Sequence, residues 1–166
     1  NITPPVKNIC PDVEKIILNE FAPVGSMIQF FACLDNLEKI ETQGFDTSQV
    51  TSMQYMLSEC PNLKELDMSE WDTSNVQVMS QMCSYCSSLS SLDMSNLDMN
   101  TVTDVSGMFA GCENLKDLHL SGVKAGNLRN INYIFYKCGS LTSLDLRGFN
   151  TSRVSTFESL FNGCYS

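Results

Sequence analysis

Thiols are the side chains in this chain whose type and spacing most directly suggest chemistry. Five cysteines follow one another at intervals of 26 residues: Cys60, Cys86, Cys112, Cys138 and Cys164. Such thiols could form disulfides or bind a metal ion, or they could be small apolar side chains that fill a repeated core position. Stacking at the strand spacing of about 5 Å would bring equivalent cysteines within disulfide range. Because each one also falls at an inward-facing position, we expect free, buried thiols.

One pair of cysteines spells a C-x-x-C motif, Cys83-Ser84-Tyr85-Cys86. A zinc site would need a second pair at similar spacing, and a redox motif would stand at a helix N-terminus in a βαβ unit. Neither condition is met, and Cys83 occupies the position that Leu57 and Phe109 hold in neighbouring repeats. We therefore interpret the motif as two core residues.

A second candidate for chemistry is a column of polar residues at one outward position of the repeat: Glu41, Asp67, Asp93, His119 and Asp145. Like charges at this spacing repel unless a cation or a partner relieves them. The column could be a binding stripe for a basic or glycan partner, a weak calcium site, or a solvated face whose aspartates bond to nearby serines. No D-x-D-x-D-G loop supports calcium. We take these five residues as the candidate ligand-binding set and expect no catalytic residue, metal or cofactor.

These residues are positioned by a repeat that reaches through most of the chain. A fixed period between about 20 and 50 residues is typical of solenoids, in which each unit buries its apolar face on its neighbours. In the clearest copy the apolar residues are spaced 3, 3, 1 and 3, which predicts a helix with one buried face. They are Val50, Met53, Met56, Leu57 and Cys60. Residues 46–48 precede this stripe as a candidate N-cap, and the alternation Leu66-x-Met68 predicts a short strand.

The repeat therefore predicts an α/β solenoid of about six coils, each a helix plus a short parallel β-strand. The expected helices span 24–34, 50–60, 76–86, 102–112, 128–138 and 154–164. The expected strands span 13–18, 37–42, 63–68, 89–94, 115–120 and 141–146. We divide the chain into an N-terminal tail or cap (1–9), atypical repeats (10–44) and regular 26-residue repeats (45–166). The array stops where another repeat should begin, so we expect an excerpt truncated at its C-terminus.

Composition narrows the range of functions. The 166-residue chain carries a net charge of −9, which disfavours a phosphate backbone or an anionic membrane surface as partner. No apolar run approaches the roughly 18 residues of a membrane span, so we expect no membrane insertion. The motifs of serine hydrolases, zinc proteases and phosphate-binding loops are absent from the sequence. These observations favour a protein that is not an enzyme.

The segment Leu66–Leu115, LDMSEWDTSNVQVMSQMCSYCSSLSSLDMSNLDMNTVTDVSGMFAGCENL, resembles a known repeat. It is similar to the BspA-like leucine-rich repeat of bacterial surface proteins, the 26-residue surface-repeat type. The resemblance covers residues 37–166 well and 10–36 loosely, and the copy that begins at Val123 departs most. It implies a leucine-rich-repeat solenoid on a secreted or wall-anchored protein, with the signal and anchor outside this segment. It also implies adhesion to host or microbial proteins or glycans, and it carries no shared catalytic site.

Three functions remain open at this point. The first is a non-enzymatic binding or adhesion module, and the second is a structural spacer in a surface stalk. The third is the recognition arm of a larger surface enzyme. The last coil, ending near Cys164, would also allow head-to-tail contact between copies.

Overall fold

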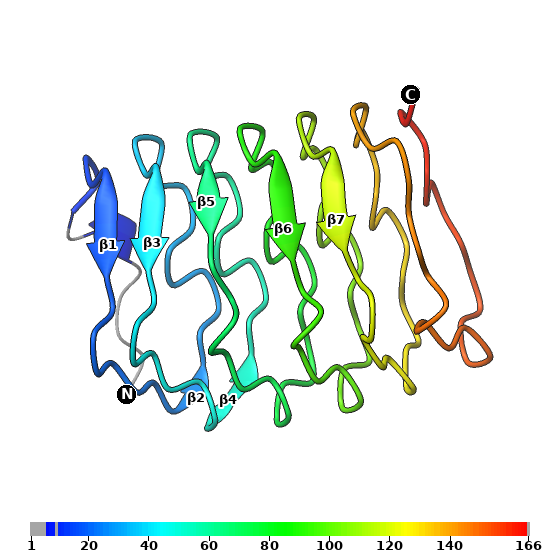
Figure 1. Cartoon of the computed structure of the whole chain (residues 1–166), viewed down its shortest axis with the longest axis horizontal. Coiled ribbons are helices and arrows are strands. Elements are labelled where there is room, and N and C mark those ends of the chain that lie inside the picture. Colours follow the sequence, from blue (N-terminus) through cyan, green and yellow to red (C-terminus); the bar gives the residue numbers. More distant parts are fainter. Residues whose placement is uncertain (1–5, 9, 166) are drawn as a thin grey trace.

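The computed structural model describes residues 6–8 and 10–165, and it is a row of coils stacked side by side (Figure 1). Successive repeats follow one another along the long axis, from β1 at one end to the last coil near residue 165 at the other. Of the expected tail or cap at 1–9, only the 3-10 helix η1 (Val6–Asn8) is described, and the rest lies outside the described residues. The division into a tail, atypical repeats and regular repeats stays a prediction.

One wall of the stack is built from five short parallel strands, which confirms five of the six expected strand positions. They are β1 (Lys15–Ile17), β3 (Lys39–Glu41), β5 (Glu65–Leu66), β6 (Ser91–Asp93) and β7 (Asp117–His119). Strand β3 lies between β1 and β5, while β6 pairs with β7. The step between paired residues is 26 from Lys39 to Glu65 but 24 from Lys15 to Lys39. The sixth expected strand, at 141–146, does not form.

A second parallel ladder runs through the opposite part of each coil. It begins with β2 (Gly25–Ser26) and β4 (Val50–Ser52). Isolated bridges then extend it through Val78 and Asp104 to Asn130, again one coil at a time. Parallel pairing therefore joins coils along both walls, although β5 and β6 are not paired with each other on the strand wall.

The six expected helices are wrong, and with them the α/β leucine-rich-repeat solenoid. Among the described residues the structure contains no α-helix. An α-helix would pair each amide with the carbonyl four residues earlier. In 53–59 the amides instead alternate between the next coil and a carbonyl three residues back. The inter-coil bonds are Met53 N–H to Val78 O, Tyr55 to Ser80 and Leu57 to Met82, at 2.8–3.0 Å. The turn bonds are Met56 N–H to Met53 O and Ser58 to Tyr55, at 3.1–3.2 Å.

Two positions in each of these turn segments take left-handed backbone angles. Tyr55 has φ 54° and Glu59 has φ 59°, a region that costs a residue with a side chain about 1–2 kcal/mol. The same angles recur at intervals of 26 residues: Gln29, Tyr55, Gln81, Gly107, Tyr133 and Ser159, then Cys33, Glu59, Tyr85, Gly111, Lys137 and Gly163. The left-handed residues reverse the chain every few residues, so the segment zigzags instead of winding into a helix.

The expected core is present although the helix is not. All five apolar residues of the 3, 3, 1, 3 stripe, from Val50 to Cys60, are fully buried. Successive tight turns bring the same positions inward as a one-sided helix does, which is why the spacing misled the prediction. Rings stack between coils along the same interior, with centroids of Phe109 and Phe135 at 6.0 Å and those of Phe135 and Phe161 at 5.7 Å.

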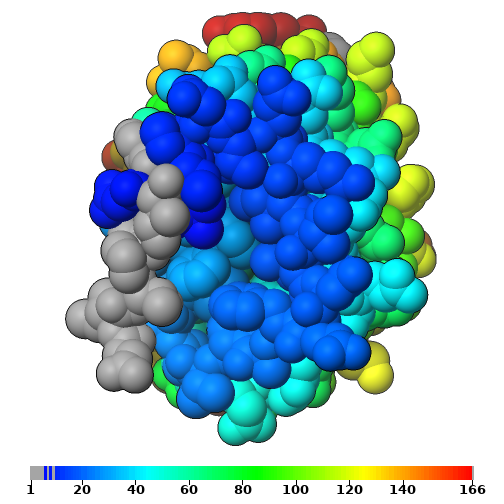
Figure 2. All heavy atoms as spheres, turned by 90° about the vertical axis from the view of Figure 1, so that its left-hand side faces the viewer, coloured from blue at the N-terminus to red at the C-terminus, as the bar shows by residue number. Residues whose placement is uncertain are grey.

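The end of the stack that carries β1 is covered by the side chains of the first coil, drawn in blue in Figure 2. Several of these side chains are apolar and exposed: Ile17, Phe21, Val24 and Ile28. At the other end Phe157 and Phe161 are about half exposed. The sides of the stack are mainly polar.

Candidate binding surface

The wall of β-strands presents two outward columns of side chains that flank one buried column. Ile40, Leu66 and Leu92 point inward and are at most 8% exposed. The residues before and after each of them point outward, as the two-residue period of a strand requires. The register places Asp93 beside His119 and Ile17 beside Glu41. Within the predicted polar column, the register thus confirms Asp93 and His119 as neighbours, while Asp145 lies where no strand forms.

Four of the five candidate residues line two adjacent depressions on this wall. The first depression, of about 380 Å³, includes Glu41 and Asp67 in its lining. The second, of about 320 Å³, includes Asp67, Asp93 and His119. Because Asp67 and Glu65 line both, the two depressions adjoin, and we call them together the strand-face groove. Asp145 lies outside both.

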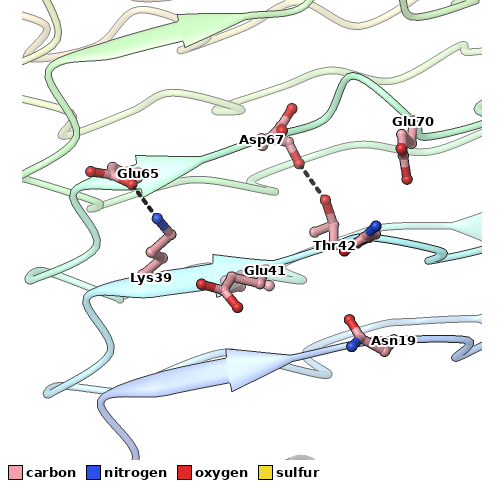
Figure 3. Close-up of a pocket in the computed structure, with 9 residues that line it drawn as sticks. Asn19, Lys39, Glu41, Thr42, Glu65, Asp67 and Glu70 are labelled. Carbon is pink, nitrogen blue, oxygen red and sulfur yellow. Dashed lines mark hydrogen bonds and ion pairs between the residues drawn. The ribbon is translucent and has the colours of Figure 1, made fainter.

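Fixed backbone and side-chain contacts shape the first depression (Figure 3). The Thr42 hydroxyl donates to the Asp67 carbonyl at 3.0 Å, which ties neighbouring coils together. The Glu70 carboxylate accepts the Gly44 N–H at 3.1 Å. Asn19 lies at the β1 side of the same depression in Figure 3. The groove can therefore offer amide and carboxylate groups in set positions to a polar partner.

Two aspartates of the groove already bind the backbone. Asp67 accepts the Ser69 N–H at 2.9 Å and Asp93 accepts the Ser95 N–H at 2.8 Å, so both close turns at the end of a strand. The Ser69 N–H, and after it the Ser69 hydroxyl, lowers the pKa of Asp67. The Ser95 hydroxyl, followed by its N–H, does the same to the pKa of Asp93. Bonding to nearby serines, one of the alternatives open at the sequence level, therefore holds for these two residues.

Asp145 is bound to Arg147 instead of facing a ligand. The Arg147 Nε donates to Asp145 Oδ1 at 2.9 Å, and its Nη2 lies 2.5 Å from Oδ2. These contacts, together with the Arg147 N–H, lower the pKa of Asp145 to about 2. Its carboxylate is thus less available than those of the groove.

Lysines pair with three glutamates of this wall, of which Glu41 belongs to the candidate set. Lys15 lies 2.7 Å from Glu41, Lys39 lies 2.9 Å from Glu65, and Lys64 pairs with Glu38. The hydrogen bond from Lys15 is the main reason why the pKa of Glu41 is lowered. The sequence showed these lysines, but the diagonal contact of Lys15 depends on the 24-residue step between β1 and β3. A bound cation is therefore not needed to hold these carboxylates together.

The cysteine column lies in the interior, away from the groove. The four from Cys60 to Cys138 are fully buried, Cys164 is partly buried, and all five are free. Each thiol donates to a backbone carbonyl of the preceding coil, 29 residues earlier, at 3.1–3.2 Å. Burial raises the pKa of the Cys60 and Cys138 thiols to about 12. The expectation of buried, unbridged thiols is confirmed.

The C-x-x-C motif also belongs to the core. Cys83 and Cys86 are both fully buried, and burial raises the pKa of each well above its ordinary value. The Cys83 carbonyl accepts the Cys112 thiol. Among the residues that the structure describes, no three potential ligands come together around a metal position. Both cysteines pack as apolar side chains.

A comparison with protein families found a matching family for this chain. Two overlapping matches, over residues 25–141 and 87–166, are to the family described as Mycoplasma protein of unknown function, DUF285. The chain belongs to this family. No curated protein and no solved structure matched. In the described part of this DUF285 chain, no helix has the length and apolar character needed to cross a membrane.

Proposed function

We propose that this chain is a non-enzymatic binding or adhesion module of a bacterial cell-surface protein. In this proposal it lies outside the cell, on the surface or anchored to the wall, and presents its strand face to a host or microbial protein or glycan. Support comes from the family, which groups Mycoplasma proteins, and from the resemblance of Leu66–Leu115 to repeats of bacterial surface proteins.

The strand-face groove is the observation on which the proposal rests. Two depressions, of about 380 and 320 Å³, adjoin and run across several coils. Hydrogen bonds between the β3 and β5 coils hold the first depression in shape before any partner arrives, and preorganisation lowers the entropic cost of binding. Glu41, Asp67 and His119 are spaced by the repeat itself, so the surface suits an extended ligand better than a compact one.

The alternation of Lys and Glu beside the groove indicates what a partner would have to offer. Lys39 donates to Glu65, and Lys15 donates to Glu41. A ligand with both donors and acceptors, such as a glycan hydroxyl array or a peptide backbone, can exchange hydrogen bonds with such a surface. These exposed ion pairs contribute little to stability, so a ligand can displace them at small cost.

A substitution set that spares the backbone turns tests the proposal. The variant Glu41→Gln, Asp67→Asn, Asp93→Asn and His119→Ala removes three carboxylates and the imidazole from the groove lining, while asparagine keeps the oxygen that closes each turn. Purified protein would be applied to a glycan array and to immobilised extracellular-matrix proteins. We expect binding to at least one surface, and we expect the variant to lose most of it while staying folded, with only a small drop in melting temperature from the two altered turns.

The matched control is Glu113→Gln with Asp117→Asn, which removes exposed charges that line neither depression. If the control weakens binding as much as the groove variant does, the groove is not the contact surface.

A structural spacer is the second candidate, and the continuous inter-coil hydrogen bonds favour it. Such bonds run from Met53 to Val78 and on to later coils, which makes the stack suitable as a stiff rod. Failure of the chain to bind any glycan or matrix protein would support the spacer over the binding module. The recognition arm of a larger enzyme would be indicated by a catalytic domain encoded in the same reading frame.

A further inference from the structure

A second groove lies on a different surface of the stack. The loops that lead from the turn segments into the strands form one edge, at the top of Figure 1. On this edge Asp35, Glu59, Pro61 and Tyr85 line an open groove of about 550 Å³. None of these residues lines the strand-face groove. We call this second feature the edge groove.

The aromatic ring of the edge groove packs against a glycine. A side chain added at Gly111 would put its Cβ 2.5 Å from Cδ1 of Tyr85, so the ring rests directly on the glycine backbone. The Tyr85 N–H is also bound, to the Ala110 carbonyl at 2.7 Å. Despite this contact, 47% of the Tyr85 residue surface remains exposed. The chain thus presents an aromatic surface beside Gly111 without burying it.

Asp35 and Glu59 of the edge groove differ from Glu41 and Glu65 of the strand face, because no ion pair among the described residues includes them. The four ion pairs among the described residues use Glu38, Glu41, Glu65 and Asp145. Asp35 and Glu59 are exposed and stand outside these pairs. The Glu59 carboxylate accepts only a long contact of 3.8 Å from the Cys33 thiol. No lysine or arginine lines the groove.

We propose that the edge groove binds a lysine or arginine side chain from a basic segment of a partner protein. The cation would lie against the Tyr85 ring, where the electron-rich face attracts positive charge. Glu59, one coil away in the same column, and Asp35 would supply the opposite charges. The net charge of −9 would draw such a segment toward the chain. The proposal concerns a surface separate from the strand face and stands whether or not that face binds a ligand.

The test uses a fluorescein-labelled peptide of alternating glycine and lysine, with fluorescence anisotropy at low ionic strength. We expect the peptide to bind and its fully acetylated counterpart to bind at least about tenfold more weakly, because acetylation removes the charge. The double variant Glu59→Gln, Asp35→Asn should weaken binding about tenfold, the sum of two exposed ion pairs. Tyr85→Leu, which keeps an apolar side chain but removes the ring, should weaken it about threefold.

The control again removes two charges, by Glu113→Gln with Asp117→Asn, and we expect a change below about twofold because neither residue lines the edge groove. Amide chemical shifts should move on peptide addition at Glu59, Tyr85 and Gly111. The four-residue variant of the strand face should leave peptide binding unchanged. Equal weakening by the control, or shifts confined to the strand face, would overturn the edge-groove proposal without bearing on the proposed adhesion function.

Discussion

Short polar side chains at the corners of the coils act as acceptors for the backbone. Asp46 binds the Ser48 N–H and Asp72 binds the Ser74 N–H, each two residues further along the chain. Asp46 was expected to cap a helix, but here the same chemistry closes a turn. Asp67 repeats this arrangement on the strand face, so the residues most exposed to a ligand also hold the corners in shape.

These carboxylates predict a loss of stability in acid. The pKa of Asp67, Asp72 and Asp93 is lowered by hydrogen bonds from the serines two residues on. A lowered folded-state pKa contributes stability above the unfolded value, near 3.8, and loses it as the pH falls through the folded value. We expect the urea midpoint to fall between about pH 5 and pH 2. Asp67→Asn with Asp93→Asn should flatten this dependence, and an unchanged slope in that variant would contradict the role of the turns.

The thiols predict a sharp division in reactivity. Cys10 is exposed, whereas Cys60, Cys86 and Cys112 are fully buried with pKa values raised by burial. Because the thiolate is the reactive form, a thiol reagent at pH 8 should modify Cys10 quickly. The buried cysteines should react only after denaturation. Rapid labelling of Cys86 in the folded protein, measured by mass spectrometry of its peptide, would show that the column is accessible.

At the scale of the element, the strands could be predicted and the turn segments could not. Leu66 and Met68 alternate with exposed residues, and only a strand places such an alternation on one wall. The stripe from Val50 to Cys60 is buried equally well by a helix and by tight turns. What distinguishes the tight turns from a helix is the left-handed backbone of Tyr55 and Glu59. Neither residue type indicates that conformation in a sequence. Gly107 and Gly111 stand at the equivalent positions two repeats later and were the available signal.

The left-handed turn positions also predict which glycines can be replaced by a residue with a side chain. Gly111 has φ 76°, and a Cβ there would meet the Tyr85 ring, whereas Gly126 has open space to 3.6 Å and no left-handed angle. Gly111→Ala should lower the free energy of unfolding by about 1–2 kcal/mol, mainly through backbone strain, since the exposed ring can move aside. Gly126→Ala should be close to neutral. Urea unfolding compares the two, and equal effects would argue against the left-handed turn.

At the scale of the molecule, the chain is a stack whose coils are joined by hydrogen bonds along two walls, with a break between β5 and β6 on the strand wall. Leu92 packs over Leu118 in the same register that sets Asp93 beside His119. The buried and the exposed columns of side chains therefore both result from the register between successive coils, and both grooves depend on that register. The lysine pairs show the same dependence, because Lys15 reaches Glu41 only in the observed register.

Hydrogen-bond scalar couplings between amide nitrogens and carbonyl carbons test this alignment most directly. In labelled protein, the amides of Met53, Tyr55 and Leu57 should couple to the carbonyls of Val78, Ser80 and Met82 in the next coil. Couplings from the amides of 54–60 to carbonyls four residues earlier in the chain would instead reveal a helix and contradict the account.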